Sequence, residues 1–239
     1  MPNLSDITGS SAFVKILREC VVEPLKGGIE GGSRRIIFYG PPGTGKTFVA
    51  KAVAGELGLS FKAVGPNDPA KELINSAKFA SRQSLVYFDS VEWVNYRPVL
   101  RDSLMNMPAE VLVVGATNFP WRVGSLVSAF PSWVFMPDPD VEARMGIFEH
   151  NLGIAADRLD VGRLADMTPG YSASDIHYLC EWVGVSGALS QERLEAAIGS
   201  YKTTQIGEWI AEANANIDRL DKATFEPLHR WLLGKEVKA

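Results

Sequence analysis

The chain has 239 residues, of which 46% are hydrophobic, and its formal net charge is −4 at pH 7. A chain of this length and composition can bury a large core in one domain, or in one domain with a small satellite. The acidic balance gives no global basic field, so the composition does not indicate bulk electrostatic attraction to nucleic acid.

The first predicted elements are a helix and a strand. Apolar residues recur at helical spacing from Ser11 to about Leu25, and Pro24 followed by Gly27-Gly28 indicates where this helix stops. The apolar run Ile36–Tyr39 then predicts a buried strand, which leads directly into a glycine-rich motif.

This motif, Gly40–Thr47, reads Gly-Pro-Pro-Gly-Thr-Gly-Lys-Thr and opens a helical pattern from Phe48 to Leu57. A strand, a glycine-rich loop and a helix in this order make up a P-loop. The glycines let the backbone N–H groups curl around phosphate at the helix N-terminus. Lys46 would reach the β- and γ-phosphates, and the Thr47 hydroxyl would ligate Mg²⁺. We therefore predict a nucleoside triphosphate site in preference to a glycine-rich turn with an incidental lysine.

Further strands alternate with helices up to Asp140. A helix is predicted over Ala70–Ala80, and the alternation predicts a doubly wound parallel α/β sheet. Beyond Asp140 the periodicity is helical throughout, which predicts a small all-helical domain joined near residues 137–140. The predicted strands are Ser60–Val64, Leu85–Asp89, Val111–Ala116 and Trp133–Met136. The predicted helices cover about 141–152, 160–166, 173–187, 190–199, 204–217 and 221–233.

Two polar residues end neighbouring apolar strands. Asp89 is well placed to hold a water on Mg²⁺, because ligands in α/β proteins collect at the carboxyl ends of strands. The alternative for Asp89 is a helix N-cap. Asn118 could orient an attacking water or touch the γ-phosphate, and its alternative is a turn asparagine before Phe119-Pro120.

The targeting and redox signals are simple. There is no run of about 18 apolar residues, and no basic region followed by an apolar stretch at the N-terminus, so we expect a soluble cytoplasmic protein without a membrane span or signal peptide. Cys20 and Cys180 lie in amphipathic helical patterns and lack metal-ligand spacing. We expect buried free thiols rather than a disulfide, as suits a reducing compartment.

Taken together, the motifs resemble those of the AAA ATPase family, most closely the branch of katanin, spastin and the vacuolar-sorting ATPases. The matching segments occur in family order and cover most of the chain to about residue 185. The runs at 115–121 and 170–176 are more specific than the P-loop. The segments are Asp6–Gly9, Gly40–Thr47, Phe88-Asp89, Gly115–Trp121, Pro137–Asp140 and Gly170–Ile176.

The resemblance implies ATP or ADP with Mg²⁺ as ligands, and a Rossmann-like α/β domain followed by a helical lid. Residues 1–30 would form an adenine-side segment and helix, residues 31–138 the P-loop α/β domain, and residues 139–239 the lid with divergent C-terminal helices. Asn151 stands where the family often has a histidine near the ribose, and His150 precedes it. The implied nucleotide-binding residues are Asp6, Ile7, Thr8, Pro42, Gly43, Thr44, Gly45, Lys46, Thr47, Phe48, Asn151, Ala173 and Ser174. The implied catalytic residues are Lys46, Asp89 and the γ-phosphate sensor Asn118, with Thr47 and Asp89 at the metal.

Two catalytic positions depart from the family pattern. The family places a glutamate directly after the strand-end aspartate, and here that position is Ser90. Losing a general base typically costs about 10²–10⁴ in rate. Glu92 stands where the family commonly has an acid of its own, and could substitute only if the backbone there is remodelled. Ser128-Ala129 replaces the arginine fingers, and Arg122 lies at the wrong spacing, so a self-assembled hexameric ring is poorly supported, whereas a monomer or a hetero-oligomer fits.

The pore-lining features of the family are also missing. The segment between the second strand and Asp89 lacks the aromatic–apolar–glycine loop that grips a polypeptide, and the segment from Glu92 to Ala109 is short. Trp93 and Tyr96 could be pore aromatics. We expect them instead to pack, because with Leu100 they fall at helix-like spacing.

The C-terminal part diverges from the family and carries apolar stripes at helical spacing. We expect these stripes to pack in the core of the lid, with a partner-binding helix as the alternative. His177 and His229 have no partners at ligand spacing, and we assign them no chemistry. The stripe residues are Trp209, Ile210, Leu220, Phe225, Leu228, Trp231 and Leu232.

Three functions are compatible with these residues. The first is an AAA-type ATPase that hydrolyses Mg-ATP slowly and couples lid movement to action on a protein partner. The second is a nucleotide-binding interaction module without significant hydrolysis, which the loss of base, finger and pore loops favours. The third, a DNA-handling clamp-loader or helicase-loader relative, has little support from the acidic balance.

Overall fold

The computed structural model describes residues 1–7, 11–26, 33–65, 84–94, 97–106, 111–203 and 206–236. In these ranges one parallel sheet of five strands has the order β2-β3-β4-β1-β5. The strands are β1 (Arg35–Tyr39), β2 (Ser60–Val64), β3 (Ser84–Phe88), β4 (Leu112–Thr117) and β5 (Ser132–Phe135). The helix predicted over Ala70–Ala80 lies outside the described residues.

The strand order places three chain segments at one edge of the sheet. β1 lies between β4 and β5, with Ile37 opposite Gly115 on one side and Trp133 on the other. β3 pairs with the other side of β4. Because all these strands are parallel, their carboxyl ends meet at the same edge. The P-loop after β1, Asp89 after β3 and Asn118 after β4 are thereby brought together.

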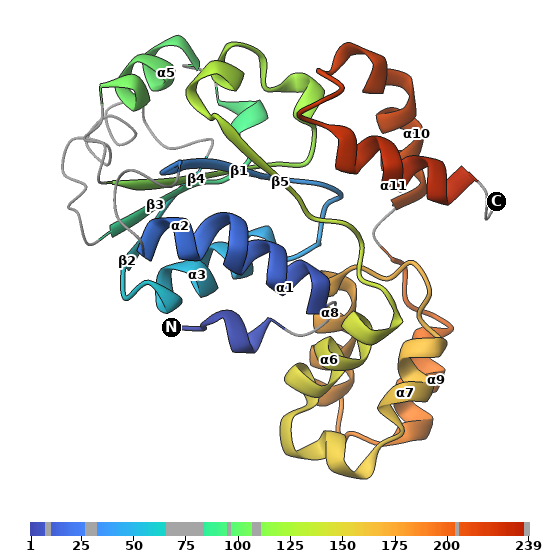
Figure 1. Ribbon diagram of the computed structural model, residues 1–239. Helices are drawn as coiled ribbons and strands as arrows, with labels where there is room; N and C mark the ends of the chain where they lie inside the picture. Colours follow the sequence, from blue (N-terminus) through green and yellow to red (C-terminus); the bar gives the residue numbers. More distant parts are fainter. Residues whose placement is uncertain are drawn as a thin grey trace.

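The first face of the sheet is covered by the N-terminal helices and the P-loop helix (Figure 1). Because side chains alternate along a strand, Phe38, Tyr87 and Val114 all point to this face, where they pack with Leu17 and Val53. The elements here are α1 (Ser11–Leu17), a π-helical turn (Arg18–Val22), α2 (Glu23–Lys26), α3 (Lys46–Glu56) and a 3-10 turn (Leu4–Asp6).

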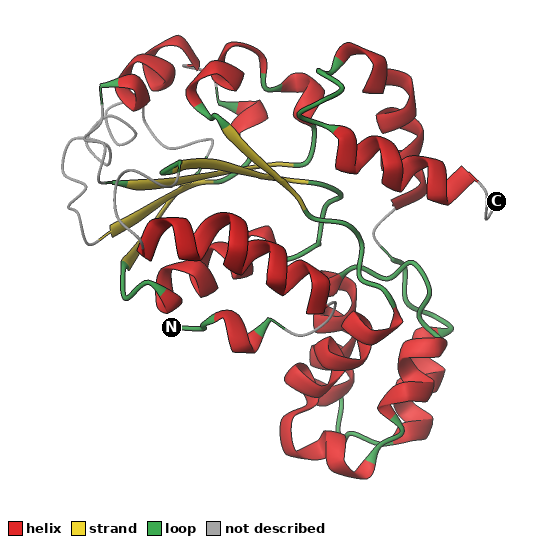
Figure 2. Ribbon diagram, in the orientation of Figure 1, coloured by secondary structure: helices red, strands yellow, loops and turns green. Residues whose placement is uncertain are grey.

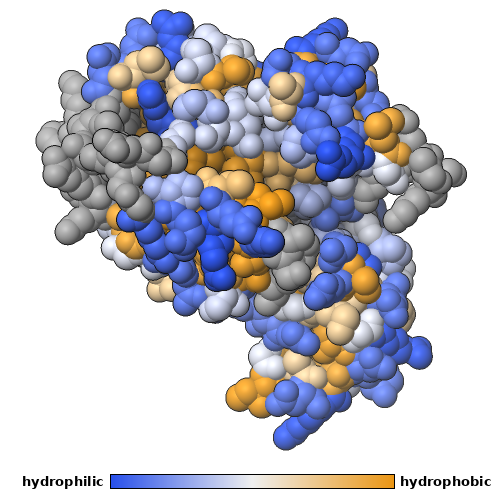
Figure 3. All heavy atoms as spheres, viewed as in Figure 1, coloured by the Kyte–Doolittle hydropathy of each residue, from blue (hydrophilic) through white to orange (hydrophobic). Residues whose placement is uncertain are grey.

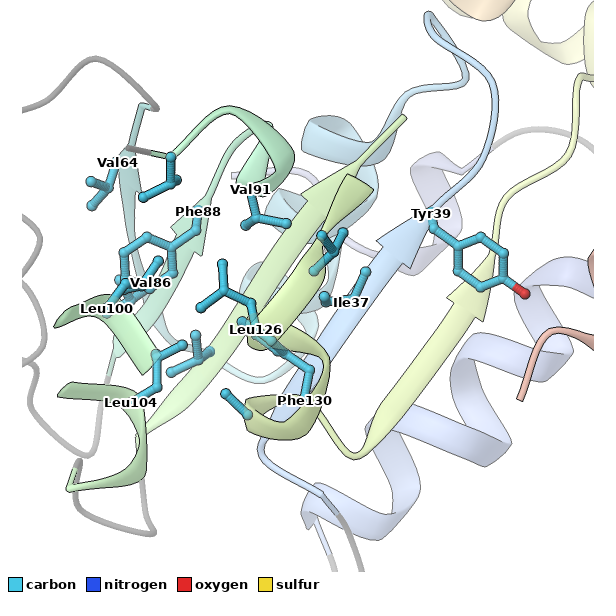
Figure 4. Close-up of a cluster of buried hydrophobic side chains, with 14 of the residues drawn as sticks. Ile37, Tyr39, Val64, Val86, Phe88, Val91, Leu100, Leu104, Leu126 and Phe130 are labelled. Carbon is cyan, nitrogen blue, oxygen red and sulfur yellow. The ribbon is translucent and has the colours of Figure 1, made fainter. Parts of the chain in front are cut away.

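The opposite face is covered by short elements and by the two C-terminal helices. Figure 4 shows Ile37, Val86, Leu100 and Phe130 in this second core layer. The covering elements are α5 (Arg97–Met105), α10 (Ile206–Asn216), α11 (Glu226–Glu236) and the 3-10 turns Val91–Trp93, Pro120–Arg122, Gly124–Ala129 and Ile217–Arg219.

The packing of α10 and α11 corrects one expectation. The apolar stripes of these helices were expected in the core of the lid, within a unit covering residues 139–239. Instead, buried Trp209, Phe225 and Leu228 belong to the same cluster as Ile37 and Tyr39 of the sheet. Periodicity along a helix identifies its apolar face but not the surface that this face covers.

The lid is a separate helical layer below the sheet in the view of Figure 2, with its own core of Phe148, Leu164, Ile176 and Leu194. Two of its helices are capped at their N-termini by side chains. The Asp140 side chain accepts from the N–H of Ala143, and Ser172 forms a capping box with Asp175. The lid elements are α6 (Val141–Leu152), a 3-10 segment (Gly153–Arg158), α7 (Val161–Asp166), α8 (Ala173–Val185) and α9 (Gln191–Ile198).

The doubly wound parallel sheet followed by a helical region is confirmed, whereas the cysteine prediction is only half right. Both thiols are free, but Cys20 is exposed and Cys180 alone is buried.

None of the helices that the structure describes is long and apolar enough to cross a membrane. Figure 3 shows hydrophobic side chains gathered in the middle of one face, whereas hydrophilic and hydrophobic side chains are mixed above and below.

Candidate functional site

The P-loop turns from β1 into α3 through two left-handed glycines. Gly43 and Gly45 have φ angles of +75° and +86°, in the region that glycine adopts without strain. α3 begins at Lys46, directly after Gly45, so the N–H groups of its first turn face the loop. A Cβ atom added at Gly45 would meet no atom within 4 Å among the described residues, so space is open on this side of the loop.

Lys46 places a buried amino group at the start of α3. Its side chain is only 8% exposed and donates to the carbonyl oxygens of Gly40 and Pro41 at 3.0 and 2.7 Å. In the described part of the chain, no carboxylate oxygen lies within ion-pair distance of its Nζ atom. Burial lowers the pKa of Lys46 to about 7, against the opposing charges of Glu92 and Asp89. This environment favours an anion beside Nζ.

Thr47 and Asp89 are joined by Tyr87, which is not among the predicted site residues. The Thr47 hydroxyl lies 2.9 Å from the Tyr87 hydroxyl, which in turn donates to Asp89 Oδ1 at 3.4 Å. Burial raises the pKa of Tyr87 above its usual range. A signal for Tyr87 was present in the sequence, because residues two apart on a strand share a face and a buried tyrosine hydroxyl needs a partner.

Asn118 is held by a buried carboxylate. Its backbone N–H donates to Glu92 Oε1 at 3.1 Å, and its carbonyl accepts from the Trp209 indole at 2.6 Å. Glu92 is 1% exposed, and its Oε2 atom has no hydrogen-bond partner in the described part of the chain. Burial raises the pKa of Glu92, whereas its hydrogen bonds and the charge of Lys46 lower it. Glu92 therefore fixes the loop of Asn118 close to the P-loop.

The backbone between Asp89 and Glu92 turns through a left-handed residue, Ser90. Ser90 adopts φ 50° and ψ 53°, the left-handed region that non-glycine residues rarely occupy. Its hydroxyl lies 3.4 Å from Asp89 Oδ1. This contact does not make the Ser90 hydroxyl a base near neutral pH, so the position offers no group that accepts a proton from water.

The lid touches the P-loop through main-chain atoms. The N–H of Ser174 donates to the Gly43 carbonyl at 3.0 Å. A Cβ atom added at Gly43 would lie 2.4 Å from the Ser172 hydroxyl, so the approach requires glycine. The N-terminus of α8 is thus seated directly on the phosphate loop.

A cavity of about 470 Å³ lies between the P-loop, the N-terminal segment and the lid. Most of its walls are apolar, as suits a heterocyclic base. The predicted residues among its lining are Asp6, Ile7, Thr44, Gly45, Phe48, Asn151, Ala173 and Ser174. Lining residues that the sequence argument did not predict include Phe13, Met136 and His177. Thr8 lies outside the described residues. Pro42, Gly43, Lys46 and Thr47 are not among the lining residues.

Two histidines lie near Asn151, the residue that the resemblance places near the ribose. Asn151 lines the cavity, and its Oδ1 atom lies 2.6 Å from Nδ1 of His177. His150 also lines the cavity and packs its ring against Phe48, with centroids 5.7 Å apart. His177, which we assigned no chemistry, therefore meets Asn151 across two lid helices. Sequence spacing could not reveal this pair, because it depends on how α6 and α8 pack.

These residues fit a nucleotide with a divalent cation. The open P-loop and the Lys46 side chain, which has no carboxylate partner among the described residues, suit phosphate. The apolar cavity suits a base. No group of three His, Cys, Asp or Glu residues that could hold a metal alone occurs among the described residues. Mg²⁺ on a nucleotide needs only one or two protein ligands, and Thr47 and Asp89 could supply these.

Arg122, the arginine nearest the finger position in the sequence, makes contacts within its own chain. Arg122 pairs with Glu212 of α10 and stacks over Phe119, with 4.4 Å to the ring centroid. Ser128 bonds the carbonyl of Ser125. Trp93 is 52% exposed in its own 3-10 turn, so it does not share a helix with buried Leu100, and Tyr96 lies outside the described residues.

Comparisons with known proteins agree with this arrangement. Residues 36–129 match the model of the ATPase family associated with various cellular activities (AAA). Vacuolar protein sorting-associated protein 4 of Dictyostelium discoideum is 29% identical over 73% of this chain and 48% of its own length. Meiotic spindle formation protein mei-1 of Caenorhabditis elegans is 26% identical over 90% of this chain and 53% of its own length. This chain thus spans about half the length of these curated relatives.

A solved structure gives the same result for the fold. A chain described under "Structural Basis for Katanin Self-Assembly" superimposes with a TM-score of 0.71 at 25% identity, covering 87% of this chain and 90% of that one. The family match spans β1 to the finger position, and the fold match extends into the helical region. The chain therefore carries a domain of the AAA ATPase family.

Proposed function

We propose that this protein binds Mg-ATP between its P-loop and its lid, hydrolyses it slowly, and passes the nucleotide state to a protein partner. The observation that carries the proposal is the buried ammonium of Lys46, which has no carboxylate within ion-pair distance in the described part of the chain and stands beside the N-terminus of α3. A triphosphate would supply the missing negative charge.

Each part of the site has a role in this proposal. The P-loop N–H groups and Lys46 hold the phosphates, and the cavity beside Phe48 holds the base. Thr47 and Asp89 orient the Mg²⁺ site, and Mg²⁺ when bound neutralises charge on the β- and γ-phosphates. Asn118, fixed by Glu92, is placed to contact the γ-phosphate.

Slow turnover is expected from the groups around Asp89. Ser90 supplies no base, and Glu92 has one carboxylate oxygen committed to the N–H of Asn118. The loss of a general base costs about 10²–10⁴ in rate. Arg122 is paired with Glu212, so it is not free to act as a finger on a neighbour. We therefore expect neither a rapid ATPase nor a ring in which copies of this chain complete each other's sites.

Action on a protein partner is supported by the kinship and by the lid contact. The names of these relatives concern protein sorting and spindle formation. In this chain the Ser174–Gly43 hydrogen bond links the lid directly to the phosphate loop. A change in the P-loop on nucleotide binding would shift this contact, and a partner bound to the lid could respond to it.

A second candidate is a nucleotide-binding switch that does not hydrolyse ATP. The specific observation in its favour is the left-handed Ser90 in the position of the expected base. Both candidates require the same pocket, so they differ only in turnover.

Single-turnover phosphate release separates the two. The protein, in excess over γ-labelled ATP with Mg²⁺, should release phosphate faster than a Lys46→Ala variant, which loses the only lysine of the P-loop. The expected rate is about 10²–10⁴ below that of a site with a base. Release no faster than in the variant would eliminate the ATPase and leave the switch.

A further inference from the structure

Tyr87 inserts a hydroxyl between the two residues that would hold the metal. Its oxygen lies 2.9 Å from Thr47 Oγ1 on α3 and 3.4 Å from Oδ1 of Asp89, which follows β3. Its side chain is 1% exposed, so the hydroxyl is buried beside half-buried Thr47 and exposed Asp89. The two metal-site residues are therefore linked through a side chain that is not itself a ligand.

The position of the hydroxyl is fixed by the fold. Tyr87 is in β3, a strand with neighbours on both sides, and its ring packs against Phe61 of β2 with centroids 5.6 Å apart. It points to the same sheet face as Asp89 and toward α3, which carries Thr47. A ring held in this way has little freedom to move its oxygen away from Thr47.

The chemistry of a threonine ligand needs such an acceptor. A hydroxyl that gives a lone pair to Mg²⁺ must direct its proton elsewhere. The Tyr87 oxygen can accept the proton of Thr47, while the Tyr87 proton points to the carboxylate of Asp89. The chain Thr47 to Tyr87 to Asp89 would then leave a Thr47 lone pair facing the metal.

A second buried tyrosine provides the contrast. Tyr39 in β1 is fully buried, but its hydroxyl has no hydrogen-bond partner in the described part of the chain. Figure 4 shows that it lies apart from the other labelled side chains, with its oxygen pointing away from them. Burial of a phenol therefore does not by itself produce the Thr47 contact.

We propose that Tyr87 is a positioning residue for the magnesium site, which orients Thr47 and Asp89 through its hydroxyl. This inference rests on the proposed function, because it concerns the Mg²⁺ that accompanies ATP. It assigns to Tyr87 a role in metal-dependent binding alone. The phosphate contacts of the P-loop and the cavity for the base do not involve the Tyr87 hydroxyl.

The test compares ATP affinity with and without Mg²⁺ in Tyr87→Phe and in Tyr39→Phe, which removes the same atom from another buried strand. Titration of ATP into the wild type in EDTA and in excess Mg²⁺ gives the increase in ATP affinity due to the metal, here called the Mg²⁺ gain. Tyr87→Phe should keep the EDTA affinity within about twofold and lose about 3–10-fold of the Mg²⁺ gain, as expected for one hydrogen bond. Tyr39→Phe should keep both.

A Thr47→Ala background shows whether Tyr87 acts through Thr47. Thr47→Ala should lose most of the Mg²⁺ gain, and adding Tyr87→Phe should cost little more. An unchanged Mg²⁺ gain in Tyr87→Phe, or an equal loss in EDTA and in Mg²⁺, would overturn the role of Tyr87 while the proposed function stands. A wild type that binds no ATP under either condition would overturn both.

Discussion

Ser90 occupies the position after Asp89 in a left-handed conformation, at φ 50° and ψ 53°. For a residue other than glycine this conformation costs roughly 1–2 kcal/mol. Glu92, two residues after Ser90, is buried against the Asn118 loop. The residue that would act as base is thus replaced, and the nearest alternative carboxylate is held by a backbone N–H group.

Restoring a carboxylate at this position tests whether the missing base limits turnover. Ser90→Glu should raise single-turnover phosphate release by roughly 10²-fold, because a general base typically contributes at least this much. Ser90→Gln is the matched control, since it adds the same bulk at the same backbone angles without a base. Equal rates in the two variants would mean that the base is not the limiting defect.

At the scale of single residues, sequence patterns located the P-loop, Asp89 and Asn118 because each follows an apolar strand directly. They indicated that Tyr87 shares a strand face with Asp89 but not that it contacts Thr47, and they gave no signal for the contact of His177. The role of Tyr87 depends on a hydroxyl contact between β3 and α3, and that of His177 on a contact between α6 and α8. Contacts between elements far apart in sequence leave no periodic signal.

Among the elements, α10 and α11 link the sheet to the Asn118 loop, which follows β4. The Trp209 indole of α10 donates to the carbonyl of Asn118, and Glu212 accepts from both Trp121 and Arg122. Leu228 of α11 is fully buried in the cluster that contains Ile37 and Tyr39, on the sheet face opposite α3. The two helices therefore stabilise the face opposite α3 and hold the loop that follows β4.

Two leucines on α11 provide a matched test of this packing. Leu228→Ala should lower the free energy of unfolding by about 2–5 kcal/mol, because it leaves a cavity in the core. Leu233 is 64% exposed, and its replacement by alanine should change that free energy by less than about 0.5 kcal/mol. Chemical denaturation of the two variants measures both values. Similar stabilities would indicate that α11 does not depend on the sheet and is available to a partner.

The strands and helices themselves were largely predictable. Central strands buried on both faces appear as unbroken apolar runs, which is why β3 and β4 were located to within a residue or so. The surface against which α10 and α11 pack was predicted wrongly. Their apolar stripes could have packed on either of two apolar surfaces, the lid core or the sheet. Only the three-dimensional arrangement decides between them.

For the molecule as a whole, the site depends on three parts of the chain meeting. The P-loop supplies Thr44 and Gly45 to the cavity, the N-terminal segment supplies Asp6 and Ile7, and the lid supplies Ala173 and Ser174. The hydrogen bond from Ser174 to Gly43 joins lid and loop without a side chain. A nucleotide between them would bridge the two layers and stabilise their relative position.

The most direct test is equilibrium binding of ATP in the presence of Mg²⁺, measured by calorimetry. The wild type should bind one ATP per chain, and Lys46→Ala should weaken binding by about 10–150-fold, because a buried charged contact to phosphate is lost. Lys51→Ala is the control, since this exposed lysine lies on the same helix and faces Phe61 at 5.8 Å. Absence of ATP binding by the wild type, or equal affinities in wild type and Lys46→Ala, would contradict the account.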